Sequence, residues 1–194
     1  MPITPPPAPV LKKSERTSAT ILQAARELFA ERGHSATTIR DVAAEAGVDP
    51  ALVMRYFGSK DELFVRAAAF ELSLPALKQV DRSKVGETLL RHFLNVWEGP
   101  EANSAMAVLL RSAASNEMSA GKLRELFSAQ VLPAIGKVGS RATAGKRAGL
   151  VATQLLGLAL CRYILKIPPV AAMSMEELVR HVAPTVQRYV MGSE

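Results

Sequence analysis

Residues 35–64 read SATTIRDVAAEAGVDPALVMRYFGSKDELF, and this segment carries the clearest structural signals of the chain. Thr38 followed by Asp41 is the capping-box pattern that begins a helix. Gly47 is suited to the left-handed conformation that ends it. Asp49, with a proline directly after it, is placed to cap the next helix, because proline is tolerated at a first helical position. The signals predict a helix of about nine residues, a short turn and a helix of about seven.

The two short helices carry the side chains that a helix-turn-helix unit needs. Ala43 supplies a small residue where the helix backbones approach, and Gly47 of the turn falls four positions later. Apolar contacts between the helices are expected at Val42, Ala46, Val48, Val53 and Tyr56. We therefore interpret the pair as a DNA-reading unit; the alternative is an ordinary helical hairpin without a DNA role.

The segments on either side of this pair are also predicted to be helical. From Ser14 onward, apolar residues follow the spacing of one buried helix face, and Gly33 is placed to end that helix. The residues of this face are Ile21, Ala24, Ala25, Leu28 and Phe29. On the other side, Ser59 with Glu62 is a second capping box, which predicts a fourth helix.

The remainder of the chain shows no alternating strand pattern, so we expect an all-α fold. Breaks that contain Gly, Pro or Ser separate the expected helices. These helices cover residues 83–98, 101–115, 122–135, 141–167 and 174–190. The last begins with a capping box, Ser174 with Glu177, and Pro184 is expected to kink it.

With these motifs in place, the segment Ile21–Phe64, ILQAARELFAERGHSATTIRDVAAEAGVDPALVMRYFGSKDELF, resembles the DNA-binding domain of the TetR family of bacterial transcriptional regulators. LLRSAASNEM (109–118) and VATQLLGLALCRYILKIPPVAAMSMEELVRHVAPTVQRYV (151–190) are similar to C-terminal domains of actinobacterial members. The resemblance implies a homodimeric repressor that leaves a near-palindromic operator when a small molecule occupies the C-terminal domain.

Three parts of the chain are expected on this basis. Residues 1–13 form a disordered Pro-rich tail, because five prolines fall within residues 2–9. Residues 14–58 form the helix-turn-helix DNA-binding domain. Residues 59–194 form the ligand-binding and dimerisation domain.

Candidate DNA contacts lie at positions of the reading unit that are expected to be exposed. Arg55 and Lys60 are expected phosphate partners, and Arg40 extends from a first helical turn toward a groove or a phosphate. Thr38 and the free amides beside it are an expected anion site. The full set is Thr38, Arg40, Asp49, Pro50, Ala51, Met54, Arg55, Tyr56 and Lys60.

Several of these residues have a second interpretation. Asp49 can accept a hydrogen bond from cytosine only when it does not cap its helix, Arg40 can pair with an acid of its own helix, and Tyr56 is either a phosphate donor or buried. Met54 stands where the family pattern usually has an aromatic hydroxyl. Since few side chains here can hydrogen bond to bases, we expect operator choice to depend on DNA shape, thymine methyl contacts and one or two arginines.

A dimer interface is expected on residues 148–160, AGLVATQLLGLAL, because a helix that is apolar on nearly every side must be covered all round. One face would pack on its own domain, and the other, together with the final helix, on a second subunit. The alternative is a helix buried wholly within one chain. The expected interface residues are Gly149, Ala152, Gly157, Ala159, Val179, Val182 and Val186.

A mainly apolar ligand pocket is expected in the same domain, with a few polar groups that orient the ligand. Its expected lining is Phe70, Leu74, His92, Phe93, Asn95, Trp97, Met106, Leu110, Phe127, Gln154 and Leu158. His92, Asn95 and Gln154 are the orienting groups. For each apolar residue in this set, plain core packing is the alternative.

Charge, cysteine content and the length of apolar runs argue for or against other classes of protein. The net charge of +6 is compatible with DNA binding, but residues 1–66 hold nine basic and eight acidic residues, so charge does not locate the site. A single cysteine, Cys161, argues against an internal disulfide and the common zinc sites and fits a reduced cytoplasm. No uncharged apolar run is long enough to span a membrane.

Motifs of enzymes are missing from the sequence as well. There is no glycine-rich phosphate loop, no GxSxG, no HExxH and no Cys/His cluster. We therefore expect no catalytic activity, no metal and no cofactor. The alternative function is a helical ligand-binding or scaffold protein without specific DNA binding.

Overall fold

The computed structural model describes residues 13–69, 71–99 and 105–192. These residues form helices and no β-strand, which confirms the all-α class. Contacts divide the chain into two compact units, Met1–Ala67 and Ala68–Glu194. This boundary lies beyond the one expected after residue 58, because α4 packs against α1 and so belongs to the first unit. The expected tail over residues 1–12 lies outside the described part of the chain.

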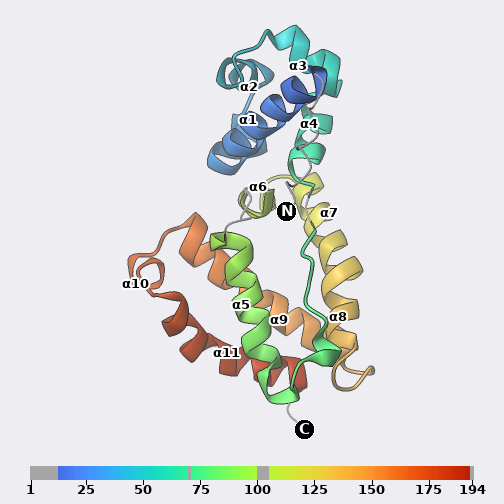
Figure 1. The fold of residues 1–194 in the computed structure, drawn as a ribbon, viewed down its shortest axis with the longest axis vertical. Coiled ribbons are helices and arrows are strands. Elements are labelled where there is room, and N and C mark those ends of the chain that lie inside the picture. The colour runs from blue at the N-terminus through green and yellow to red at the C-terminus, as the bar shows by residue number, and fades with distance from the viewer. Residues whose placement is uncertain (1–12, 70, 100–104, 193–194) are drawn as a thin grey trace, which may run out of the picture. The chain divides into compact units, whose positions relative to one another are not determined.

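The described residues of the first unit form four helices, which Figure 1 labels. They are α1 (Lys13–Ala36), α2 (Ile39–Glu45), α3 (Pro50–Phe57) and α4 (Lys60–Ala67). The predicted inner face of α1, from Ile21 to Phe29, is buried, and Phe29 packs edge-on against Phe64 of α4 with ring centroids 5.1 Å apart. Gly33 leaves the helical conformation with φ 77°, which confirms the predicted break.

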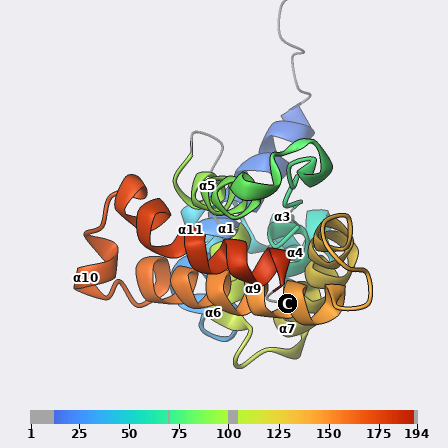
Figure 2. The same cartoon turned by 90° about the horizontal axis from the view of Figure 1, so that it is seen from below.

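The second unit contains seven α-helices within its described residues. They are α5 (Val85–Glu98), α6 (Ala105–Ser112), α7 (Glu117–Leu126), α8 (Leu132–Gly136), α9 (Ala144–Ala159), α10 (Pro168–Ala171) and α11 (Met175–Met191). Short 3-10 turns, Leu77–Gln79 and Arg82–Lys84, precede α5. In Figures 1 and 2, α11 lies against α5 and α9, and these three helices enclose much of the core.

Two predicted helices of this unit are each interrupted. The one expected over residues 122–135 begins earlier, because Asn116 caps it, and a π-helical turn over Phe127–Val131 separates α7 from α8. The helix expected over 141–167 begins at Ala144 and ends in a second π-helical turn, Leu160–Ile164. A pair of prolines then starts the separate helix α10.

Close packing of α5 on α11 depends on Gly86. A Cβ at this position would lie 2.5 Å from the backbone nitrogen of Gln187, so only glycine fits. The Gly86 amide donates to the Gln187 side chain at 2.6 Å. The predicted capping box of Ser174 and Glu177 begins α11, which runs through Pro184.

Arg147 is a structural residue, although it stands in a basic stretch of the sequence. Its side chain is buried, and it donates to the carbonyl oxygens of Val190 and Ser140. Burial lowers the pKa of its guanidinium. The hydrogen bonds tie the start of α9 to the end of α11 and to the loop before α9.

Neither a membrane-spanning helix nor a group of metal-ligating side chains is found in the described residues.

Candidate nucleic-acid interface and ligand cavity

The helix-turn-helix pair is held together by buried side chains of α2 and α3. Val42 and Ala43 of α2, and Val53 and Phe57 of α3, are at most 2% exposed. Gly47 adopts φ +64°, the left-handed conformation that the turn between the helices requires. The residues expected to add contacts, Ala46, Val48 and Tyr56, are half-buried. The inward face of α3 is therefore fixed, and its opposite face is free.

That opposite face carries few hydrogen-bonding groups. Ala51, Met54 and Arg55 are exposed, and the side chain of Met54 reaches 43%. Pro50, at the first helical position, is half-buried. The surface can therefore offer methyl contacts to bases and a single guanidinium.

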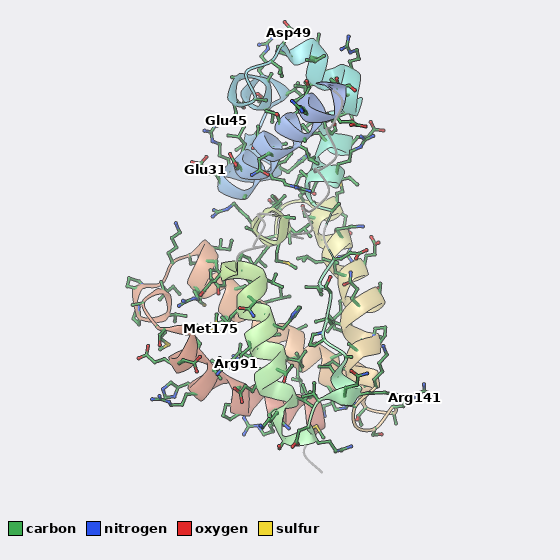
Figure 3. All side chains as sticks on the ribbon, in the orientation of Figure 1. Glu31, Glu45, Asp49, Arg91, Arg141 and Met175 are labelled. Atoms are coloured by element: carbon green, nitrogen blue, oxygen red, sulfur yellow. The ribbon has the colours of Figure 1, made fainter. Side chains whose placement is uncertain are left out.

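Asp49 caps α3, as the sequence predicted. Its Oδ1 accepts a hydrogen bond from the Ala51 amide at 2.7 Å. Figure 3 labels the residue at the start of α3. One carboxylate oxygen is thus engaged by the helix backbone.

Thr38 is engaged in the capping box that starts α2. Its amide and its hydroxyl both donate to Asp41 Oδ2, at 2.8 and 2.7 Å, and its hydroxyl accepts from the Asp41 amide. These bonds hold the pKa of the Asp41 carboxyl below its usual value. Both donors of Thr38 are therefore engaged within the capping box, and Thr38 is not a free donor to a phosphate.

Three cations remain beside the exposed face of α3. Arg40 is exposed and forms no ion pair with any described residue, so pairing with an acid of its own helix is not observed. Arg55 lies over the ring of Tyr56, with its guanidinium carbon 5.8 Å from the centroid. Lys60 is half-buried in the first turn of α4. Both Arg40 and Arg55 are therefore accessible from solvent.

A contact that the sequence did not predict joins α1 to α4. His34 Nε2 lies 2.9 Å from Asp61 Oδ1, and the His34 ring packs edge-on against Phe64. The two partners are 27 positions apart, and neither belongs to a motif. No local pattern could have paired them.

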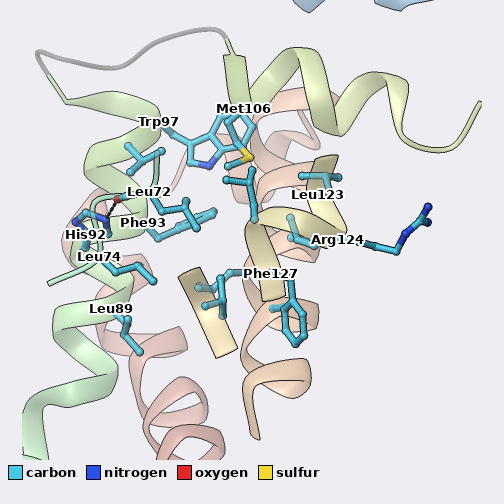
Figure 4. A pocket seen from close by; sticks show the side chains of 16 residues that line it. Leu72, Leu74, Leu89, His92, Phe93, Trp97, Met106, Leu123, Arg124 and Phe127 are labelled. Carbon is cyan, nitrogen blue, oxygen red and sulfur yellow. Dashed lines mark hydrogen bonds between the residues drawn. The ribbon is translucent and has the colours of Figure 1, made fainter. Parts of the chain in front are cut away.

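An apolar cavity of about 290 Å³ lies within the second unit (Figure 4). It is lined by residues of α5, α6, α7 and α9, of the π-helical turn after α7, and of the segment before α5. The lining residues are Leu72, Leu74, Leu89, His92, Phe93, Val96, Trp97, Met106, Leu123, Arg124, Leu126, Phe127, Val131, Ala152, Leu155 and Leu156. Its volume is close to the lower end of the range for small-molecule pockets, roughly 300–1,000 Å³.

Six of the expected lining residues lie at this cavity: Leu74, His92, Phe93, Trp97, Met106 and Phe127. Four do not line it. Asn95 is exposed, Leu110 and Gln154 are half-buried elsewhere, and Leu158 packs in the core against Leu90 and Leu178. Phe70 lies outside the described residues.

Trp97 is held in place by a polar cluster at the end of α5. Its indole stacks on Tyr163 with centroids 4.5 Å apart and planes at 3°. Glu98 Oε1 accepts hydrogen bonds from Tyr163 Oη and Arg162 Nε, both at 2.7 Å. Burial opposes ionisation of Glu98, but these bonds hold its pKa below the usual value. Burial also raises the pKa of Tyr163.

One side of α9 is exposed and apolar. The residues of this α9 face recur at helical spacing: Leu150, Thr153, Leu156 and Gly157 are exposed, Gly149 is half-buried, and the exposed Leu160 follows directly in the π-helical turn. Leu156 also reaches the edge of the cavity. A Cβ added at Gly149 or Gly157 would meet no atom within 4 Å. The helix is therefore not covered all round by the described residues of one chain.

Most residues of the expected dimer interface face the core or the cavity of their own protomer, so that prediction is corrected here. Ala159 and Val186 are fully buried in the core, Val179 is 8% exposed, and Val182 packs against the core clusters. Ala152 lines the cavity. These residues face the protomer's own core because α11 directs its apolar stripe toward α5. Only Gly149 and Gly157 of the expected set lie on the α9 face.

Comparisons with protein families match both units. A family model described as "Bacterial regulatory proteins, tetR family" matches residues 21–67, and one described as "Tetracyclin repressor-like, C-terminal domain" matches residues 83–190. Together they cover every α-helix named above, except residues 13–20 of α1 and Met191 at the end of α11.

Individual proteins are similar to the chain over different lengths. An HTH-type transcriptional repressor of Mycobacterium tuberculosis is 59% identical over 49 residues, which are 25% of this chain and 26% of that protein. The match thus spans about a quarter of that curated relative. A crystal structure of a TetR-family regulator from Streptomyces coelicolor is 33% identical, covers 94% of this chain and 99% of that chain, and superposes with a TM-score of 0.61.

A third comparison extends the likeness of fold. NalD, the secondary repressor of the MexAB-OprM multidrug efflux pump in Pseudomonas aeruginosa, superposes with a TM-score of 0.66 at 19% identity, over 91% of this chain and 97% of that chain.

Proposed function

The chain belongs to the TetR family of bacterial transcriptional regulators, and from this premise we propose that it is a homodimeric repressor that binds a near-palindromic operator and is released by a small, largely apolar ligand. Membership places the chain among transcriptional regulators and not among enzymes. The M. tuberculosis relative is itself named a transcriptional repressor, which supports the direction of regulation.

The observation that carries the DNA-binding part is the division of α3 into two faces. Val53 and Phe57 anchor the helix in the core, while Ala51, Met54 and Arg55 face away from it. A recognition helix in a major groove needs this arrangement. In this proposal Met54 and Ala51 contact thymine methyls, and Arg55 contacts a phosphate or a base.

Arg40 and Lys60 complete the proposed interface from the neighbouring helices. Arg40 has no ion pair with a described residue to give up on binding, so its full charge is available to the phosphate backbone. Lys60 adds a second cation at the start of α4. Thr38 and Asp49 act mainly through the helix ends that they cap. Tyr56 supports the guanidinium of Arg55.

Dimerisation is proposed through the α9 face. Exposed leucines and two unobstructed glycines let a second copy of the helix approach closely. A two-fold axis at this face would present two recognition helices to successive half-sites of a symmetric operator.

The test is a gel-shift titration over a range of salt concentrations, with DNA that flanks the gene and with an unrelated duplex of equal length. We expect binding to the flanking DNA with a steep salt dependence. Arg55→Ala combined with Lys60→Ala should weaken binding and lower the salt slope by about one for each phosphate that is no longer neutralised.

The control variant is Lys122→Ala, which removes a half-buried cation of the second unit that pairs with Glu125. It should leave affinity and slope unchanged. Equal binding of both duplexes, or no binding by the wild-type chain, would instead favour a helical ligand-binding or scaffold protein.

A further inference from the structure

Trp97 carries a buried hydrogen-bond donor at the ligand cavity. Its Nε1 is sealed from solvent and has no hydrogen-bond partner among the described residues. Figure 4 draws the indole nitrogen beside the Met106 side chain, at one end of the cavity that both residues line. A buried N–H without an acceptor carries an uncompensated desolvation penalty, because its hydrogen bond to water is lost and not replaced. An acceptor supplied from the cavity would remove this penalty.

The indole is not free to turn toward another acceptor. It stacks face to face on Tyr163, whose hydroxyl is fixed by Glu98, and Glu98 is held in turn by Arg162. Two charged partners thus hold the ring that supports Trp97. The direction of the N–H is set by the protein before any ligand arrives.

Met106 lies beside the indole at this end of the cavity. Its side chain lines the same cavity and is only 7% exposed. Methionine is unbranched and adapts its shape to its neighbours at low cost. In the proposal below, the ligand shifts this side chain and so reaches the N–H.

The cavity offers no charge to an ionised ligand. Among its described lining residues only His92 and Arg124 are ionisable. His92 Nε2 donates to the carbonyl oxygen of Leu72 at 2.7 Å. Arg124 donates to Glu117, and Figure 4 shows its guanidinium pointing away from the cavity. A carboxylate or an ammonium group placed there would be desolvated without a partner.

We propose that the cavity binds a neutral, largely apolar molecule with one hydrogen-bond acceptor, such as a carbonyl or ether oxygen, and that Trp97 Nε1 donates to it. The proposal rests on the cavity being the effector site of the proposed function. The donor selects its ligand, because a molecule of the same shape without the acceptor leaves the buried N–H unpaired.

Three probes on one diphenyl scaffold separate these properties. Benzophenone has a neutral acceptor, diphenylmethane has none, and diphenylacetate has a charge. Calorimetry gives their affinities for the full chain. Because Trp97 is the only tryptophan, the ¹H–¹⁵N spectrum of the protein holds one indole signal, which reports on this donor alone.

We expect benzophenone to bind about tenfold more tightly than diphenylmethane, which corresponds to one hydrogen bond to a buried group. Diphenylacetate should bind most weakly. Benzophenone should shift the indole proton downfield, and diphenylmethane should not.

Two variants complete the test. Trp97→Phe keeps an aromatic ring and removes the donor, so the two neutral probes should bind it with nearly equal affinity. Phe93→Leu removes aromatic surface from the same cavity, so both affinities should fall by a similar factor and their ratio should persist.

Equal binding of the two neutral probes to the wild-type protein, or tightest binding of diphenylacetate, would overturn the proposed ligand class and leave a ligand-responsive repressor intact. If none of the probes binds, both the proposed ligand class and the assignment of this cavity as the effector site are wrong. Operator binding, measured on the same preparation, would then still decide the DNA-binding part of the function.

Discussion

The carboxylate of Asp49 is bound to the backbone of α3, and this limits its part in DNA recognition. Its Oδ1 accepts from the Ala51 amide, at a helix end that must approach the DNA in the proposed function. A carboxylate there also repels phosphate. In the proposed function, Asp49 therefore contributes by starting the recognition helix at the right residue, while Arg40 and Arg55 attract the DNA.

Asp49→Asn and Asp49→Ala separate capping from base reading. Asparagine caps as well as aspartate, so Asp49→Asn should keep the stability and the base preference of the wild-type chain. Asp49→Ala should lower the free energy of unfolding by about 0.5–2 kcal/mol. Chemical denaturation and a binding-site selection measure the two effects. A changed base preference in the asparagine variant would show that the side chain reads a base.

Arg147 has a similar structural role in the second unit. Its guanidinium satisfies carbonyl oxygens at the end of α11 and in the loop before α9, in a place that water does not reach. Gly139, at φ +68°, lies against it, since a Cβ there would come within 3.0 Å of the guanidinium.

Arg147→Ala should therefore lower the free energy of unfolding by about 2–4 kcal/mol, because it leaves buried carbonyl oxygens without donors. Lys146→Ala, at the exposed neighbouring position, is the matched control and should change stability by no more than about 0.5 kcal/mol. Urea denaturation of the two variants gives the comparison. Equal stabilities would mean that Arg147 is dispensable.

Among the helices, α9 has two apolar faces with different roles. One face packs in the core through Ala148, Val151 and Leu158, while the α9 face defined above is exposed except at the half-buried Gly149. Exposed apolar side chains that gather on one helix face are typical of a binding surface, and the proposed function assigns this one to the dimer. A second copy of the chain is the partner that the family predicts.

Leu150→Glu with Leu160→Glu should convert the dimer into a monomer, because two carboxylates would have to be buried against their symmetry mates. Both leucines are exposed in the single chain, so the protomer should stay folded. Val65→Glu, at an exposed apolar residue of α4 in the first unit, is the control and should remain dimeric. Sedimentation velocity distinguishes the states; a dimeric double variant would place the interface elsewhere.

The helix starts were predictable because their signals are local. Thr38 with Asp41, Asp49, and Ser174 with Glu177 each form the cap that their spacing predicts. The π-helical turns were not predictable, since no residue pattern marks them. Each π-helical turn changes the helix face on which the following side chains lie.

The ligand cavity was predicted only in part for a related physical reason. On α9, Leu155 lines the cavity and Leu158 packs in the core, although both are apolar and close in sequence. Composition cannot distinguish two apolar faces of one helix. Long-range contacts, such as His34 with Asp61, likewise leave no local pattern.

In the whole molecule, the proposed function couples a DNA-reading unit to a ligand-binding unit through a change in population. A ligand that binds one conformation of the dimer more tightly draws the population toward it, and affinity for the operator falls by the same coupling free energy. Two recognition helices related by a two-fold axis require an operator with the same symmetry.

The decisive measurement for a symmetric, operator-binding dimer is selection of binding sites from random duplexes with the full-length wild-type protein, followed by footprinting of the enriched sequence. We expect an inverted repeat with half-sites about one helical turn or a multiple of it apart, protected symmetrically. Enrichment of a single unrepeated element, or of no sequence at all, would contradict the proposed function.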